Sequence, residues 1–275
     1  MGGPNFLILG APRAGTSWLY TVLREHPSLW LPPVKELHYF DKLARTRTWL
    51  DPYERRRVRP RPDLWHLKYL FGSRDDQWYE SLFMRAQYRG LIAGEATPDY
   101  AVLGEEVLER IYSMNPNIKL ILIMRDPIDR SWSAVNNAMK KGRVAQPSPE
   151  RHLRWALRTN PMARSNYAAS IKRLETIFPT ANLYYCFFDD LAERPNEFIA
   201  DVLSFLGVME METQATWSNA VNAVARGRPV PNKFAHGLAK ELLPTVAELC
   251  ERFDGPPQRW LARCEQLLKI STSTA

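Results

Sequence analysis

The segment NFLILGAPRAGTS, residues 5–17, joins a short apolar run to a loop that contains two glycines. Asn5–Leu9 is apolar enough for a buried strand and is followed directly by Gly10. After the loop, apolar residues recur at helical spacing from Leu19 to Leu23. A strand, a loop and a helix in this order are typical of the start of an α/β domain.

The same alternation of patterns continues along the chain. Strand-like apolar runs are found at Gly90–Gly94, Lys119–Met124 and Asn182–Phe188. Helical spacing is found at Glu105–Met114, Ile128–Lys140, Ser165–Phe178, Glu197–Leu206 and about Leu238–Phe253. These patterns predict an α/β fold with a mainly parallel central sheet flanked by helices. We expect Pro244 to interrupt the last helix near its start, and residues 271–275 to be frayed.

The loop Gly10–Ser17 has the glycine spacing of a phosphate-binding loop, G-x-x-x-x-G-K-[ST]. Glycines let the backbone approach an anion, and the N–H groups that open the following helix point toward it. Thr16 stands where a nucleoside-triphosphate enzyme has Lys, and Arg13 is the cation of the loop. A tight turn without a ligand is the alternative. The two glycines, the cation and the Thr-Ser pair favour a phosphate site unlike that of a kinase.

A second anion signal follows the apolar run KLILIM. Arg125 comes directly after this run, and ligands of open α/β sheets bind at the carboxyl ends of strands. Ser133 lies about two turns into the next helix. A guanidinium and a hydroxyl together make a phosphate clamp. Taken alone, the pair is equally consistent with a surface turn.

Five stretches together resemble the sulfotransferase family. They are GAPRAGTSWLY, VKELHYFD, GEATPDY, LILIMRDPIDRSWS and FFDDLAERPNEFIADVLSFLGV. The likeness is to the branch of bacterial and heparan-sulfate-type enzymes, from about Asn5 to Val208 and more loosely to Trp260. It implies a P-loop-like three-layer fold. It also implies 3′-phosphoadenosine 5′-phosphosulfate (PAPS) as sulfuryl donor, adenosine 3′,5′-bisphosphate as product, and no metal. The absence of an internal repeat and of a low-complexity linker favours a single domain over residues 1–275.

The resemblance also implies where the donor binds. The first loop would hold the 5′-phosphosulfate through Arg13, Ala14, Gly15, Thr16, Ser17 and Trp18. Arg125 and Ser133 would hold the 3′-phosphate. The stretch Arg226-Gly227-Arg228 loosely resembles a late basic loop that covers this phosphate, and a surface loop is the alternative. PAPS has no β,γ-phosphate chain and needs no Mg²⁺ bridge. The Lys that kinases carry at the position of Thr16 would therefore have no β- or γ-phosphate to bind.

The segment after the first helix supplies candidates for the chemistry. Sulfuryl transfer needs charge stabilisation on the donor and a base for the acceptor proton. Glu36 occupies the place of the general base in the heparan-type enzymes, and His38 is the alternative because it titrates nearest neutrality. In an extended segment both side chains would face the same way. Arg13, where the family commonly has Lys, can neutralise the leaving oxygen but cannot protonate it, whereas Lys35 can. Without the resemblance, Lys35 and Glu36 would be interpreted as solvated loop charges.

The resemblance is least clear across residues 42–90, an Arg- and Trp-rich insertion. Its run Arg55–Arg61 can steer an anionic acceptor or form a solvated face. Its aromatic residues can stack on a sugar or pack a core; they are Trp49, Trp65, Trp78 and Tyr79. The insertion is therefore a candidate acceptor-binding region.

Three further residues have open roles. Glu95 either orients a site residue or caps a turn. Ala96 stands where the family often has Lys, so a cation is lost there. Tyr167 either contacts the nucleotide or packs in the core.

Charge and composition narrow the class of partner. The 275 residues include 37 Lys and Arg against 30 Asp and Glu, a formal charge of +7, with the composition of a globular protein. We expect a small-molecule, glycan or lipid acceptor and no nucleic-acid partner. We also expect no integral membrane segment, and the protein can be a monomer or a homodimer. The three cysteines form no metal-like cluster and favour a cytoplasmic enzyme. A luminal domain of a secretory-pathway enzyme without its anchor is the alternative.

Two other functions compete with sulfuryl transfer. A kinase with a degenerate loop would use Asp126 to hold a metal, but it lacks the loop Lys. A non-catalytic polyanion binder would use the Arg run, but the charge is spread over the chain and no nucleic-acid motif is apparent.

Overall fold

The computed structural model describes residues 2–43, 63–144, 148–209 and 229–272. These residues form one five-stranded sheet in the order β2-β3-β1-β4-β5, in which all neighbouring strands are parallel. The strands are β1 (Phe6–Gly10), β2 (Leu29–Trp30), β3 (Ile92–Ala96), β4 (Lys119–Met124) and β5 (Leu183–Phe187). The predicted α/β fold with a parallel sheet is confirmed.

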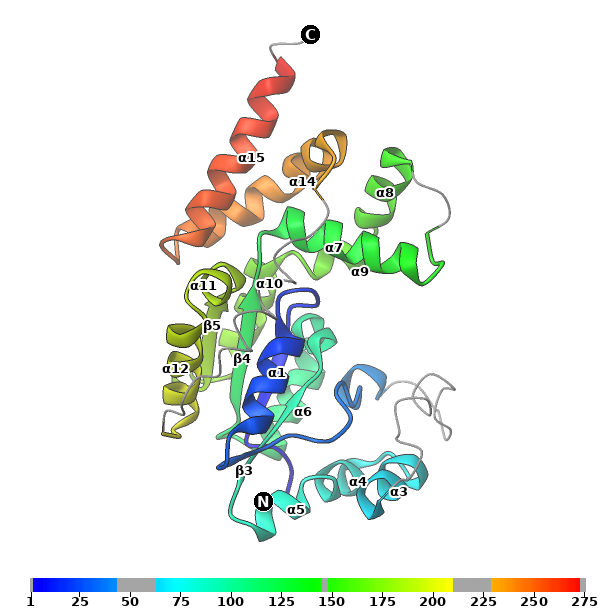
Figure 1. The fold of residues 1–275 in the computed structure, drawn as a ribbon, viewed down its shortest axis with the longest axis vertical. Helices are drawn as coiled ribbons and strands as arrows, with labels where there is room; N and C mark the ends of the chain where they lie inside the picture. The colour runs from blue at the N-terminus through cyan, green and yellow to red at the C-terminus, as the bar shows by residue number, and fades with distance from the viewer. Residues whose placement is uncertain (1, 44–62, 145–147, 210–228, 273–275) are drawn as a thin grey trace.

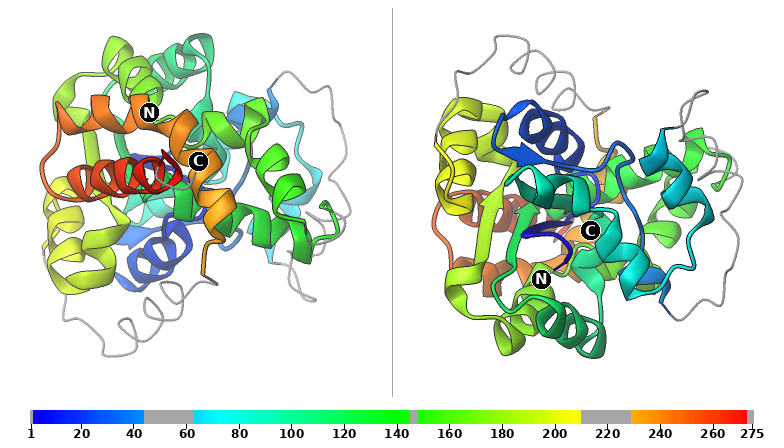
Figure 2. Two further views of the ribbon diagram at one scale, coloured as in Figure 1. Left: turned by 90° about the horizontal axis from the view of Figure 1, so that it is seen from above. Right: turned by 90° about the horizontal axis from the view of Figure 1, so that it is seen from below.

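Helices cover both faces of the sheet (Figure 2). One face carries α1 (Thr16–Glu25) and α12 (Pro195–Leu206), and the other carries α6 (Glu105–Met114) and α10 (Tyr167–Ile177). Because helices cover both faces, the central strands are apolar at nearly every position: all five residues of β1 are buried, as are all but the first residue of β4.

The remaining helices lie beside the sheet or beyond one of its two ends (Figure 1). Before β3 come α3 (Leu64–Phe71), α4 (Asp76–Ser81) and α5 (Met84–Tyr88). After β4 come α7 (Pro127–Lys140), α8 (Pro149–Ala156) and α9 (Thr159–Ala163), and after β5 comes α11 (Phe188–Glu193). The chain closes with α14 (Asn232–Cys250) and α15 (Pro256–Thr272), which with α7 and α8 enclose a second hydrophobic cluster. None of the described helices is both long and apolar enough to cross a membrane.

Several predicted boundaries need correction. The strand predicted at Gly90–Gly94 is β3 and begins at Ile92, because Gly90 adopts a left-handed turn with φ of 63°. The helix predicted at about Leu238–Phe253 is α14; it begins at Asn232 and contains Pro244 in its interior. Its buried stripe, which includes Phe234 of the first turn, packs against Trp132 and outweighs the cost of the proline.

Other boundaries differ by a few residues. Three predicted elements differ from the observed ones at their ends. The strand predicted at Asn182–Phe188 is β5 and ends at Phe187, where α11 follows directly. The helix predicted at Ser165–Phe178 is α10 (Tyr167–Ile177), and the helix predicted at Glu197–Leu206 is α12, which begins at Pro195. The predicted frayed tail is partly wrong, because α15 continues to Thr272; residues 273–275 lie outside the described part.

The described part of the 42–90 insertion has an aromatic core. Trp65, Trp78 and Tyr79 are buried, and Trp65 stacks on Tyr69 with 5.4 Å between ring centroids. This packing favours the core interpretation of these aromatics over sugar stacking. Trp49 and the run Arg55–Arg61 lie outside the described residues.

Gly10 brings the first loop into close contact with the 3₁₀ turn η2 (Pro98–Val102). A Cβ at Gly10 would lie 2.8 Å from the Pro98 carbonyl oxygen and 2.7 Å from the Ala101 Cβ, at a φ of +155°. We expect Gly10→Ala to lower the free energy of unfolding by about 2–4 kcal/mol in urea denaturation, because backbone must move. Gly104→Ala is the matched control, with open space at its Cβ and an expected change of about 0.5 kcal/mol. Equal effects of the two substitutions would contradict the prediction.

Candidate active site

The candidate residues gather at the carboxyl ends of β1, β3 and β4. The loop Gly10–Ser17 follows β1, and Arg125 follows β4. The segment that contains Glu36 lies against the end of β3, where the Glu36 N–H donates to the Ala96 carbonyl at 3.0 Å. This edge is where ligands bind in parallel α/β sheets.

The first loop ends at a glycine that α1 requires. Gly15 precedes α1 with a φ of 91°, and a Cβ there would lie 2.8 Å from Leu191 Cδ2. Ser17 is exposed at the start of α1, whereas Ala14 and Thr16 are buried. Trp18 is buried against Phe198, so its side chain belongs to the core and only its backbone is available to a donor.

Arg13 and Arg125 bring together the two anion signals predicted from the sequence. The Arg13 Nε donates to Ser133 Oγ at 2.9 Å, and Arg125 Nη1 donates to the Arg13 carbonyl at 3.1 Å. Arg125 is held over the ring of Phe188, with 4.4 Å from Cζ to the centroid. Burial and the neighbouring Arg125 lower the pKa of Arg13.

Arg130 is a third cation of this site, which sequence reasoning missed. Its side chain is only 1% exposed and donates to Ser165 Oγ at 2.7 Å, to Ser131 Oγ at 3.0 Å and to the Pro161 carbonyl at 3.0 Å. Burial and the nearby arginines lower its pKa to about 10. Its place one helical turn before Ser133 was a signal, although nothing in the pattern showed that it would be buried.

The arginine cluster lacks a directly paired carboxylate among the described residues, although burial and Arg125, which lower the pKa of Arg13, are opposed by the charge of Glu36. No carboxylate described in the structure forms an ion pair with Arg13, Arg125 or Arg130. Arg125 and Arg130 are buried, whereas Arg13 is exposed. Buried cations are normally paired, because an uncompensated charge in a low-dielectric region is costly. The cluster is therefore suited to a ligand that carries several negative charges.

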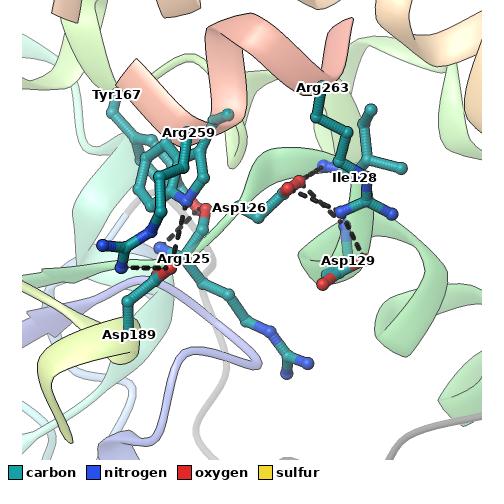
Figure 3. A network of polar contacts seen from close by, with 9 residues as sticks. Arg125, Asp126, Ile128, Asp129, Tyr167, Asp189, Arg259 and Arg263 are labelled. Carbon is teal, nitrogen blue, oxygen red and sulfur yellow. Dashed lines mark hydrogen bonds and ion pairs between the residues drawn. The ribbon is translucent and has the colours of Figure 1, made fainter. Parts of the chain in front are cut away.

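Asp126 is engaged elsewhere, although it is adjacent to Arg125. Its Oδ1 accepts from the Ile128 N–H at 2.8 Å and caps α7, and its Oδ2 accepts from Arg263 of α15 at 2.6 Å. Figure 3 shows the Arg125 side chain directed away from this ion pair. Tyr167 is buried in the same region, and its hydroxyl donates to the Arg125 carbonyl at 2.9 Å. Tyr167 thus supports the backbone of Arg125 from the core.

The second half of the site is the segment Lys35–Asp41. Lys35 Nζ lies 2.8 Å from Glu36 Oε1, and His38 Nε2 lies 3.7 Å from Glu36 Oε2. The other imidazole nitrogen, Nδ1, lies 2.9 Å from Asp41 Oδ2. Glu36 therefore lies beside His38, as expected, and Lys35 and Asp41 lie in the same cluster. The His38–Asp41 spacing of three residues was the sequence signal that we missed.

The backbone of this segment differs from the extended form expected. Glu36 and His38 both have positive φ, at 61° and 54°. Their side chains meet because of two left-handed residues and not because of strand alternation. Glu36 and His38 thus lie close together, but the extended backbone from which this closeness was predicted is wrong.

His38 carries a proton at neutral pH. Burial alone would lower its pKa, but hydrogen bonds to Asp41 and Glu36 raise it to about 9. A protonated imidazole cannot accept the proton of a substrate. This favours Glu36 over His38 as the candidate base.

Asp99 and Arg164 extend the same cluster toward α9. Arg164 Nη2 lies 2.7 Å from Asp99 Oδ1, and one ligand atom each of His38, Asp41 and Asp99 lie within 4.8 Å of one another. The imidazolium of His38 and the guanidinium of Arg164 already compensate the two carboxylates. We therefore interpret the group as an ion-pair network and assign no metal to it. Arg226, Gly227 and Arg228 lie outside the described residues, so their predicted role stays a prediction.

Comparison with known proteins agrees with this geometry. The sequence model of the sulfotransferase family matches residues 4–212. The chain belongs to the sulfotransferase family. The sulfotransferase from Alicyclobacillus acidocaldarius is 25% identical and superposes with a TM-score of 0.62, over 90% of this chain and 95% of that one. The resemblance and the P-loop-like fold predicted from the sequence are confirmed.

Two curated sulfotransferases are similar over part of their length. Human heparan sulfate glucosamine 3-O-sulfotransferase 6 is 27% identical over 215 residues, which are 76% of this chain and 54% of the relative. Membrane-associated sulfotransferase kil1 of Dictyostelium discoideum is 28% identical over 134 residues, which are 47% of this chain and 22% of the relative. The chain thus matches about half or less of the length of these relatives.

Proposed function

We propose that this protein transfers a sulfuryl group from PAPS to a hydroxyl or amine, with Glu36 as general base. One observation carries the proposal: Arg13, Arg125 and Arg130 converge without a carboxylate ion pair within the described ranges, beside an acid–base segment at the same sheet edge. PAPS matches both halves, because it is a small polyanion that delivers an electrophilic sulfur to a nucleophile.

The donor would bind across the two anion signals. The backbone N–H groups at the start of α1, with Arg13, Thr16 and Ser17, fit a 5′-phosphosulfate. Arg125 fits the 3′-phosphate, because its guanidinium presents a fixed fork of hydrogen-bond donors. The Ser133 hydroxyl would be a further donor to this phosphate, and its oxygen accepts from Arg13 Nε at 2.9 Å. The donor set is cationic and hydroxylic, which suits phosphate and sulfate oxygens.

The transfer step needs one proton acceptor and one stabilised leaving group. Glu36 would take the proton of the attacking hydroxyl or amine as the new S–O or S–N bond forms. The bond that breaks joins sulfur to the 5′-phosphate oxygen, whose developing negative charge Arg13 would stabilise. Lys35, 2.8 Å from Glu36 in the free protein, can supply a proton or a positive charge to the same oxygen. His38, as an imidazolium fixed by Asp41, would help to orient Glu36.

The acceptor class follows less directly. The name of the human relative specifies a glucosamine of heparan sulfate. We propose that the acceptor is a carbohydrate, a lipid or a small natural product. Among these three classes we favour a carbohydrate, because this relative is named for one. A cytoplasmic location and a homodimer stay predictions.

Phosphoryl transfer by a degenerate kinase loop fits the site less well. The loop has Thr16 in place of Lys, and the candidate metal-holding acid, Asp126, is occupied by the cap of α7 and by Arg263. Freeing that carboxylate would break an ion pair and a helix cap together.

Ligand-induced thermal stabilisation tests the donor class. We expect adenosine 3′,5′-bisphosphate to raise the melting temperature, because at about 100 times Kd a ligand of the native state adds about 2.7 kcal/mol. ATP with Mg²⁺ and heparin should each have a smaller effect. Transfer from radiolabelled PAPS to heparan sulfate and to 2-naphthol then identifies a working acceptor. Strong stabilisation by ATP with Mg²⁺ and none by the bisphosphate would contradict the proposal.

A further inference from the structure

The catalytic segment has a backbone that its own sequence does not favour. Glu36 and His38 are non-glycine residues with positive φ, a conformation that costs free energy and persists only when surrounding contacts impose it. The contacts that impose it therefore control where the Glu36 carboxylate and the His38 imidazole lie.

One buried hydroxyl holds the end of this segment. The Tyr100 oxygen accepts from the Tyr39 N–H at 3.0 Å and from the Phe40 N–H at 3.3 Å. Tyr100 is 1% exposed, and its ring packs edge-on against Phe40 with centroids 5.4 Å apart. The two N–H groups directly after His38 thus share a single acceptor on η2.

Glu95, on β3, fixes the direction of that hydroxyl. Its Oε1 accepts from Tyr100 Oη at 2.9 Å and from Thr97 Oγ1 at 2.6 Å, and its Oε2 accepts from Tyr79. A phenol has one proton to donate. Since that proton goes to Glu95, the oxygen lone pairs remain for the two N–H groups.

The start of the segment is fixed by the same part of the chain. The Glu36 N–H donates to the Ala96 carbonyl at 3.0 Å, one residue beyond Glu95. Both anchors of residues 36–40 therefore come from residues 95–100, and the two left-handed residues lie between them.

We propose that Tyr100, oriented by Glu95, is a positioning residue for sulfuryl transfer: its hydroxyl holds the backbone after His38 so that Glu36 and His38 share one site. The inference rests on the proposed role of Glu36. Tyr100 contacts neither donor nor acceptor in this role and acts through the segment alone. Its removal should therefore change turnover and the surroundings of His38, but not donor binding.

The test is Tyr100→Phe, which removes one oxygen and keeps the ring. With radiolabelled PAPS and the acceptor that the wild type sulfates, we expect kcat to fall at least tenfold. The Kd for adenosine 3′,5′-bisphosphate should change less than threefold. In an NMR titration, the pKa of His38 should fall at least one unit from about 9, because Asp41 and Glu36 would no longer be held beside it. Tyr184→Phe on β5 is the matched control and should leave all three quantities unchanged.

The outcomes separate the alternatives. Unchanged turnover, or an unchanged pKa of His38, would each overturn the proposal, because both must move if the hydroxyl positions the segment. If Tyr100→Phe does not fold, Glu95→Gln provides the same test, since an amide cannot accept all the hydrogen bonds that the carboxylate accepts. A wild type that transfers no sulfuryl group would refute the proposed function, whereas the His38 titration would still report on the positioning.

Discussion

Glu36→Gln should lower the turnover number about 10²–10⁴-fold, which is the usual contribution of a general base. The amide has nearly the shape of the carboxylate but cannot take up the proton of the attacking hydroxyl or amine. In the proposed site, donor binding depends on the cluster of Arg13, Arg125 and Arg130. We therefore expect the Kd for adenosine 3′,5′-bisphosphate to change by less than about threefold, because the ion pairs that Glu36 makes in the free protein are with Lys35 and His38 and not with the arginines of the proposed donor site.

Single-turnover transfer from radiolabelled PAPS, together with calorimetric titration of the bisphosphate, measures the two quantities separately. Glu109→Gln, on the exposed face of α6, is the control for the same chemical change and should behave as wild type. Near-full turnover by Glu36→Gln would exclude Glu36 as the base. His38→Ala would then be the next variant to examine, although the imidazole is protonated in the free protein.

Arg125→Met should weaken binding of adenosine 3′,5′-bisphosphate by about 10–100-fold, equivalent to the roughly 1.5–3 kcal/mol of a hydrogen bond to a charged group. Methionine keeps contact with the Phe188 ring but removes the fork that would bind the 3′-phosphate. The free energy of unfolding without ligand should change by less than about 1 kcal/mol. The lost bond to the Arg13 carbonyl is offset by relief of repulsion within the arginine cluster.

Calorimetric titration at one fixed salt concentration gives the affinity, and urea denaturation gives the stability. Arg194→Met is the matched control, because this surface arginine is already paired with Asp190 and Glu197. It should leave affinity unchanged. An unchanged affinity for Arg125→Met would remove Arg125 from the donor site, and a large loss of stability in the free protein would show a structural role.

Much of the candidate site was predictable because its signals are local. The glycine spacing of residues 10–17, and an arginine directly after a buried strand, report what the backbone does within a few residues. Arg130 and Asp41 lay inside the same quoted stretches, yet nothing in the pattern indicated their burial or partners. The roles of Arg164 and Tyr100 could not be predicted from the sequence, because they depend on contacts with segments that are distant in the chain.

The sequence by itself determined the α/β class and the order of the main strands and helices, since apolar periodicity is a property of short segments. The family followed from the resemblance of five short stretches to sulfotransferases. Only the tertiary structure decided which polar groups meet and which charges are compensated. Arg13 meets Ser133 from 120 residues away, Asp126 is neutralised by Arg263, and Glu36 and His38 adopt left-handed conformations imposed by residues 95–100. The free energy of a charge or of a strained backbone depends on the groups that surround it in space, and folding brings those groups together from distant parts of the chain.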